Sequence, residues 1–92
     1  SSGANLRGVD LRGVDLADAN LRGAYHIFPI AGDIYIWHVV RWDDGIRIQA
    51  GCHWFTVQEA QAHWIGKGEH GAICRASINA AVAMAKVRGW KI

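Results

Sequence analysis

Four five-residue units follow one another near the start of the chain, at residues 4–8, 9–13, 14–18 and 19–23. Each unit begins with Ala or Val, continues with Asn or Asp, and has Leu in its third position. A period of five fits neither an α-helix, which repeats near 3.6 residues, nor a flat β-strand, which repeats at 2. The chain must therefore turn after each short extended piece, and a stacked coil satisfies this requirement.

The unit resembles the motif of the pentapeptide-repeat family, A-(D/N)-L-x-x, whose fold is a right-handed, four-sided β-helix. The resemblance implies that the central leucines fill the coil: Leu6, Leu11, Leu16 and Leu21. It also implies that Arg7, Arg12 and Arg22 point outward. Family members that imitate DNA are long acidic rods, whereas here three arginines are balanced by three aspartates. We therefore expect no DNA mimicry and no double-stranded DNA partner.

A single coil has two open ends, and repeat units are stable only when neighbours cover such ends. The remainder of the chain is expected to cover one end. The other end can be covered by a second copy, by an upstream segment or by a different protein. The predicted fold is α+β, with a short right-handed quadrilateral β-helix coil over residues 1–28. A β-hairpin and two helices over residues 29–92 are expected to pack with the coil as one unit. The chain is expected to assemble as a homo-oligomer.

Composition limits the classes of function. Half of the 92 residues are hydrophobic and five are Trp, which argues against disorder. The net charge of +2 is too small for a general nucleic-acid binder. The absence of a long apolar run and of a signal-peptide pattern predicts a cytoplasmic protein without a membrane partner, in the host cell if the protein is viral. The two cysteines are expected to be free thiols.

Residues 34–42 and 46–50 predict a hairpin around Asp43-Asp44-Gly45, after a turn marked by Pro29 and Gly32-Asp33. Two registers are open. A three-residue loop with Gly45 in a bulge groups Ile36, His38, Val40, Trp42, Ile46, Ile48 and Ala50 on one face, and Tyr35, Trp37, Val39, Arg41, Arg47 and Gln49 on the other. A two-residue loop instead moves Arg47 and Gln49 to the face of Trp42, Val40 and His38. We favour the bulged loop because it separates polar from apolar residues.

Two helices are expected after the hairpin. The capping box Thr56-Val57-Gln58-Glu59 starts the first, which continues through Ile65 and ends at Gly66-Lys67-Gly68. The second runs from about Ala72 to Val87 and stops at Gly89, with Trp90 packing back onto the core. It is apolar on more than one side, which predicts burial or an oligomer interface.

The stretch from Gly51 to Ala60, followed by His63-Trp64, resembles the C-terminal block of small bacteriophage proteins that carry pentapeptide repeats. This resemblance implies a viral accessory role. It does not identify a ligand.

Metal binding is one candidate chemistry, through residues Cys52, His53, His63, His70 and Cys74. His70 and Cys74 are four residues apart and can lie one helical turn from each other. A zinc site needs four ligands in a tetrahedron, usually with a close pair of like ligands, and no such pair is present. We therefore expect no metal and no cofactor, with the cysteines as small core residues and the histidines at the surface or an interface.

A Cys/His nucleophile is a second candidate, with Cys52 activated by His63. Single Cys and His residues in a small domain are more often structural. The chain has no paired carboxylates, phosphate loop or dinucleotide fingerprint. We therefore predict that the protein is not an enzyme and has no catalytic residue.

The third candidate is a ligand-binding surface of aromatic and arginine side chains. Its predicted members are Tyr35, Trp37, Arg41, Arg47, His53 and Trp54. Aromatic rings stack on bases and guanidinium groups pair with phosphate, so the surface suits a nucleotide-like anion. The same composition suits a protein interface, which composition alone favours.

We therefore predict a non-catalytic, phage-type accessory protein that engages or sequesters a host component. An anionic nucleotide-like signal held at subunit interfaces is the ligand considered, in a counter-defence role. The alternative is an assembly or scaffold module without a ligand.

Overall fold

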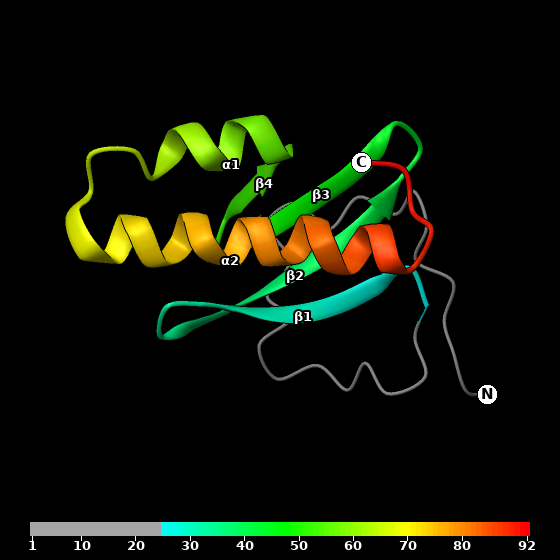
Figure 1. Cartoon of the computed structure of the whole chain (residues 1–92), viewed down its shortest axis with the longest axis horizontal. Coiled ribbons are helices and arrows are strands. Elements are labelled where there is room, and N and C mark those ends of the chain that lie inside the picture. Colours follow the sequence, from blue (N-terminus) through cyan, green and yellow to red (C-terminus); the bar gives the residue numbers. More distant parts are fainter. Residues whose placement is uncertain (1–24) are drawn as a thin grey trace.

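The structure, a computed structural model, describes residues 25–92. This part is an α+β fold with a four-stranded antiparallel sheet in the order β1-β2-β3-β4 and two helices (Figure 1). The elements are β1 (Ile27–Gly32), β2 (Tyr35–Trp42), β3 (Gly45–Ala50), β4 (His53–Phe55), α1 (Val57–His63) and α2 (Gly68–Val87). The β-helix coil predicted for residues 1–28 lies outside the described residues up to position 24, and β1 begins at Ile27.

The sheet contains more than the expected hairpin, because β1 and β4 flank it as edge strands. Pro29 was predicted to mark a turn, and this prediction is wrong. Pro29 lies inside β1 opposite His38, and an edge strand tolerates proline because one side of its backbone needs no ladder hydrogen bond. The turn expected at Gly32-Asp33 is present, since Gly32 pairs with Tyr35 across Asp33-Ile34.

The register of the β2–β3 hairpin differs from the favoured one. Trp42 pairs with Gly45, so the turn has two residues, Asp43 and Asp44, and no bulge. Val40 consequently lies opposite Arg47, and Val39 lies opposite Ile48. Separation of polar from apolar residues was the wrong criterion, because both faces of this sheet carry buried side chains.

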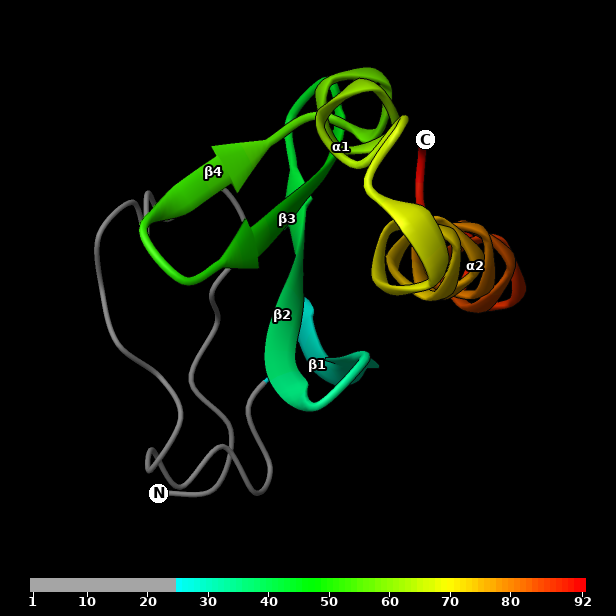
Figure 2. The same cartoon turned by 90° about the vertical axis from the view of Figure 1, so that its left-hand side faces the viewer.

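The face of the sheet that packs on the helices, here the helix face, carries the hydrophobic core. Figure 2 shows α2 along this side of the sheet and α1 above β3. Core residues from the strands include Trp37, Val39, Ile46 and Ile48, and α2 contributes the buried residues Cys74, Ile78, Ala81 and Ala85. The other side of the sheet, here the opposite face, carries the buried residues Val40, His38 and Gln49.

The first helix begins as predicted at a capping box. The Thr56 hydroxyl accepts a hydrogen bond from the Glu59 backbone N–H at 3.2 Å, and the Glu59 carboxylate accepts one from the Thr56 N–H at 2.9 Å. This reciprocal pair satisfies two backbone donors that the first turn leaves unpaired. The helix ends at His63, earlier than expected.

The second helix begins at Gly68, four residues before the predicted start, and ends at Val87 as predicted. Gly89 stops it with a φ of 77°, which glycine adopts without a Cβ penalty. Trp90 then packs on Phe28, with ring centroids 5.4 Å apart, which confirms the predicted return to the core. Within residues 25–92, neither helix has the combination of length and apolar character needed to cross a membrane.

Truncating the fully buried Ile78 side chain is expected to destabilise the fold. Ile78→Ala should lower the free energy of unfolding by about 2–5 kcal/mol, because it removes buried methyl groups and leaves a cavity against the sheet. Urea denaturation measures the change. Ile65→Ala is the matched control, since Ile65 is largely exposed and its truncation should cost under about 0.5 kcal/mol. Equal losses in both variants would contradict the described core.

Candidate functional site

The structure does not bring the six predicted ligand residues together. Trp37 is 3% exposed and belongs to the core, where its ring stacks on Trp64 with centroids 4.7 Å apart. Tyr35 is exposed at the start of β2, where its ring lies 6.4 Å from that of His70. These two residues are therefore not part of a shared surface with Arg47.

Arg41 and His53 lie elsewhere as well. Arg41 pairs with Ile46 and so shares the helix face, whereas Arg47 is on the opposite face. His53 stacks on Phe55 with centroids 4.7 Å apart, and its ring lies at the same centroid distance from His63. The two-residue turn explains the separation of the arginines. Compared with the favoured register, it moves each side chain of β3 to the other face of the sheet relative to β2, so Arg47 no longer shares a face with Arg41.

Arg47 and Trp54 are the two predicted residues that do come together, and Trp42 joins them. The Arg47 guanidinium carbon lies 5.9 Å from the centroid of the Trp42 ring. The Trp54 ring packs edge-on against Trp42 with centroids 5.4 Å apart. The three side chains come from β3, β4 and the end of β2, and we call them the Arg47 cluster.

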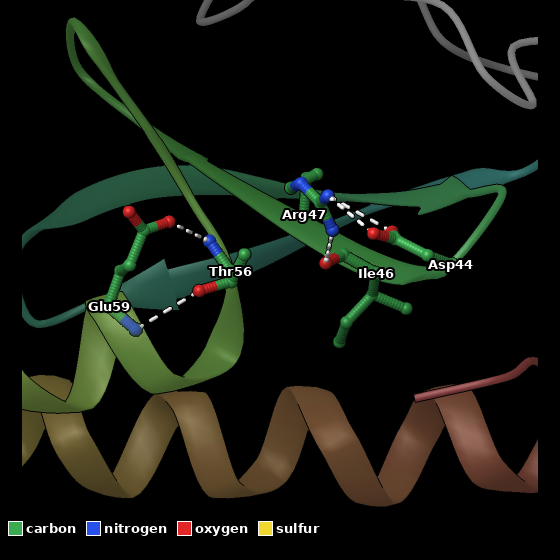
Figure 3. Close-up of polar contacts among 5 residues, drawn as sticks. All are labelled: Asp44, Ile46, Arg47, Thr56 and Glu59. Atoms are coloured by element: carbon green, nitrogen blue, oxygen red, sulfur yellow. Dashed lines mark hydrogen bonds and ion pairs between the residues drawn. The ribbon is translucent and has the colours of Figure 1, made fainter.

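Arg47 also makes polar contacts at the turn (Figure 3). One terminal nitrogen donates to the Ile46 carbonyl at 3.0 Å, and the other pairs with the Asp44 carboxylate at 3.0 Å. The Arg47 side chain is 15% exposed and that of Asp44 is 68% exposed. The hydrogen bond from Arg47 holds the pKa of Asp44 below its ordinary value, so the carboxylate is charged at neutral pH.

A hollow of about 400 Å³ adjoins this ion pair. It lies between the β2–β3 turn, the start of α1 and the end of the chain. The lining residues are Asp44, Gly45, Ile46, Arg47, Thr56, Val57, Gln58 and Ile92. The hollow therefore combines a guanidinium that is paired with an exposed carboxylate and several polar side chains, and Arg47 connects it to the Trp42 and Trp54 rings, which do not line it.

Sequence reasoning missed Trp42 and Asp44 as site residues. Trp42 immediately precedes the turn and Asp44 lies in it. The signal was the alternative two-residue loop, which places Trp42 and Arg47 on one face. The register thus decided the membership of the site.

The candidate metal ligands are dispersed. His70 and Cys74 lie one turn apart as expected, with Cys74 Sγ 3.7 Å from His70 Nε2. The other ring nitrogen, Nδ1, lies 2.7 Å from a carboxylate oxygen of Asp33. His63 instead contacts Lys67, with Nε2 3.3 Å from the lysine nitrogen. Among the described residues, no group of three or more His, Cys, Asp or Glu side chains is placed to hold a metal ion.

Cys74, His70 and Asp33 are arranged like a nucleophile, a base and an orienting carboxylate, respectively. Cys74 is buried, however, and burial together with the charge of Asp33 raises the pKa of its thiol. A raised pKa keeps the thiol protonated and therefore weakly nucleophilic. The candidate Cys52 is exposed in the β3–β4 turn, and the contacts found for His63 go to Lys67, His53, Phe55 and Trp64.

Comparison with known proteins bears on the N-terminal segment. Residues 2–25 match the family model described as Pentapeptide repeats (8 copies). This match confirms the pentapeptide-repeat character of that segment. No curated protein and no solved structure matches the chain.

The two thiols are expected to differ in reactivity. Ellman's reagent should modify Cys52 rapidly in the native protein and Cys74 only after unfolding, because Cys52 is exposed whereas Cys74 is buried with a raised pKa. The absorbance of the released thiolate measures both rates. Cys52→Ser should abolish the fast phase, and a fast phase that survives this substitution would contradict the assignment.

Buried His38 predicts a pH dependence of stability. Burial lowers its pKa below 6.5, with the Gln49 hydrogen bond acting in the other direction, and its Nδ1 is buried without a hydrogen-bond partner in the described structure. The unfolded chain therefore binds the proton more readily. The contribution of His38 to the free energy of unfolding is intact above the unfolded pKa and is lost as the pH falls below it.

His38→Leu removes this titration. Between roughly pH 7 and about pH 5, the free energy of unfolding should fall less steeply in the variant than in the wild type, as measured by urea denaturation at each pH. His63, whose pKa is also lowered, remains in both proteins and contributes equally. Identical slopes would contradict the role assigned to His38.

Proposed function

We propose that this protein is a non-catalytic binding protein that forms a homo-oligomer and sequesters an anionic, nucleotide-like ligand. One observation carries the proposal: the Arg47 guanidinium both lines a hollow of about 400 Å³ and lies 5.9 Å from the centroid of the Trp42 ring, which is outside the lining of the hollow. The combination supplies a charge for phosphate and a ring for a base.

In the polar half of the site, a ligand anion can take the place of the Asp44 carboxylate. Arg47 is paired with Asp44, whose side chain is 68% exposed. An ion pair with one exposed partner contributes little to stability, so an incoming anion can replace Asp44 at small cost. A phosphate group also accepts two parallel hydrogen bonds from a guanidinium, which gives it an advantage over the present contact.

The aromatic half of the site comes from Trp42 and Trp54, which are both partly exposed. Their edge-to-face contact fixes the orientation of the Trp42 ring. Stacking on a base favours binding without strong sequence or base preference. This half therefore supports a planar ligand over an inorganic anion.

The non-catalytic part of the proposal is supported by the protonated, buried Cys74 thiol. The wider role rests on the resemblance of the segment after Gly51 to phage proteins with pentapeptide repeats. In this proposal the protein acts in the cytoplasm of an infected host and withholds a host signal from a defence response. The repeat segment forms a β-helix coil and residues 29–92 cap it. A scaffold without a ligand is the competing function.

Loss of the guanidinium is expected to abolish capture. Native mass spectrometry of wild-type protein purified gently from cells should show added mass of a few hundred daltons per site, and calorimetry with a panel of mononucleotides and cyclic dinucleotides should identify the ligand class. Arg47→Ala should weaken binding by roughly tenfold to a hundredfold, because charge-assisted hydrogen bonds are lost, while leaving the oligomer intact.

Two further variants sharpen the test. Arg75→Ala removes an arginine from α2, outside the Arg47 cluster, and should leave ligand affinity unchanged. Asp44→Asn removes the competing carboxylate and should strengthen binding severalfold. Wild-type protein that retains no added mass and binds no nucleotide would exclude the proposal and favour the scaffold.

A further inference from the structure

The side of α2 that points away from the sheet is largely apolar, and no other helix or strand of residues 25–92 covers it. The buried residues of this helix line one side: Gly71, Cys74, Ile78, Ala81 and Ala85. The other side carries exposed apolar residues, with Ile73 37% exposed, Met84 42% and Val87 89%. Ala72, Ala76 and Ala83 lie between them and are also exposed. We call this set the outward side of α2, and Figure 2 shows no other labelled element beyond it.

Opposite charges lie at the two ends of this side, while the half-buried Arg75 borders it and the exposed Asn79 lies in its middle. Glu69 lies in the first turn of α2 and Lys86 in the last, roughly 25 Å apart at 1.5 Å per residue. Both are exposed, and neither takes part in an ion pair within residues 25–92. The side therefore has an acidic end, a mostly apolar middle that includes the polar Asn79, and a basic end.

We infer that the outward side of α2 is the interface with a second copy of this chain, in which the two α2 helices run antiparallel across a two-fold axis. An antiparallel arrangement places Glu69 of each copy beside Lys86 of the other, whereas a parallel arrangement places like charges together. The inference deepens the proposed function, since it rests on the homo-oligomer and assigns the surface that forms it.

The middle of the helix fits the same arrangement. With Glu69 opposite Lys86, the axis passes between Ser77 and Ile78, so Ala72 lies opposite Ala83. Ala76 lies close to the axis, opposite the exposed Asn79 of the other copy. Alanine side chains allow two helices to approach closely, near the lower end of the usual interaxial range of about 8–10 Å. Ile73, Met84 and Val87 then lose exposed apolar area on both copies.

Self-complementarity favours a second copy over an unlike protein. A two-fold interface requires that each residue and its contact appear on the same surface. The outward side meets this condition with its opposite charges at equal distances from its centre. An unlike partner would impose no such arrangement.

A charge at the centre of the interface is expected to disrupt it. In Ala76→Glu, two like-charged carboxylates come close to each other near the axis, which should weaken association by about tenfold or more. Sedimentation velocity over a concentration series, without nucleotide, measures the effect. Ala62→Glu is the control, because Ala62 is exposed on α1 and its substitution should leave association unchanged. Circular dichroism should show equal helix content in both variants.

Charge exchange tests the antiparallel arrangement. Glu69→Lys and Lys86→Glu should each weaken association, since each creates two like-charged contacts, and the double variant should recover most of the wild-type affinity. Both substitutions also oppose the helix macrodipole, so stability should fall further in the double variant. Recovery of association despite lower stability therefore separates the interface from a stability effect.

Three results would overturn the inference: a monomeric wild type, an Ala76→Glu variant that associates like the wild type, or a double exchange without recovery. Failure of the proposed ligand site has a different signature. Arg47→Ala should associate normally whether or not the protein captures a nucleotide.

Discussion

The two-residue turn between β2 and β3 is the constraint on which the rest of the described structure depends. It pairs Trp42 with Gly45, and because side chains alternate along a strand, it sends Ile46 and Ile48 to the helix face and Arg47 to the opposite face. Gly45 has a φ of 154°, and a Cβ there would lie 2.7 Å from the Ile92 carbonyl oxygen. The turn thus fixes the core, the site and the position of the chain end together.

The opposite face explains the character of the Arg47 cluster. Val40, His38 and Gln49 are buried on this face, and Arg47 is 15% exposed beside them. Electrostatic contacts strengthen where water is largely excluded, so a partly buried guanidinium interacts more strongly with an anion than a surface arginine does. The Asp44 carboxylate is largely exposed, and water that binds it weakens its ion pair with Arg47. These conditions favour exchange of Asp44 for a ligand anion.

The sequence predicted those features that short-range chemistry controls. The capping box at Thr56 and the stop at Gly89 follow from neighbouring residues, and the structure contains both. The packing of Trp90 on Phe28 was also predicted, although it is a tertiary contact. Other features set by tertiary packing were missed. The strand containing Pro29 forms because β2 offers it an edge, and Trp37 is buried because Trp64 packs on its ring. The predicted set of ligand residues was wrong for the same reason, since a shift of one residue in register places Arg41 and Arg47 on different faces of the sheet.

The proposed interface between copies and the proposed ligand site lie on different sides of the described structure. The sequence led to the expectation that a ligand would be held between subunits by Trp and Arg. In the structure, Arg47 lies on the opposite face of the sheet, whereas the outward side of α2 lies beyond the helix face. Copies that pair through α2 would not cover the Arg47 cluster of either copy. In the proposed dimer each copy therefore has its own ligand site, and we expect ligand binding to leave the α2 contact unchanged.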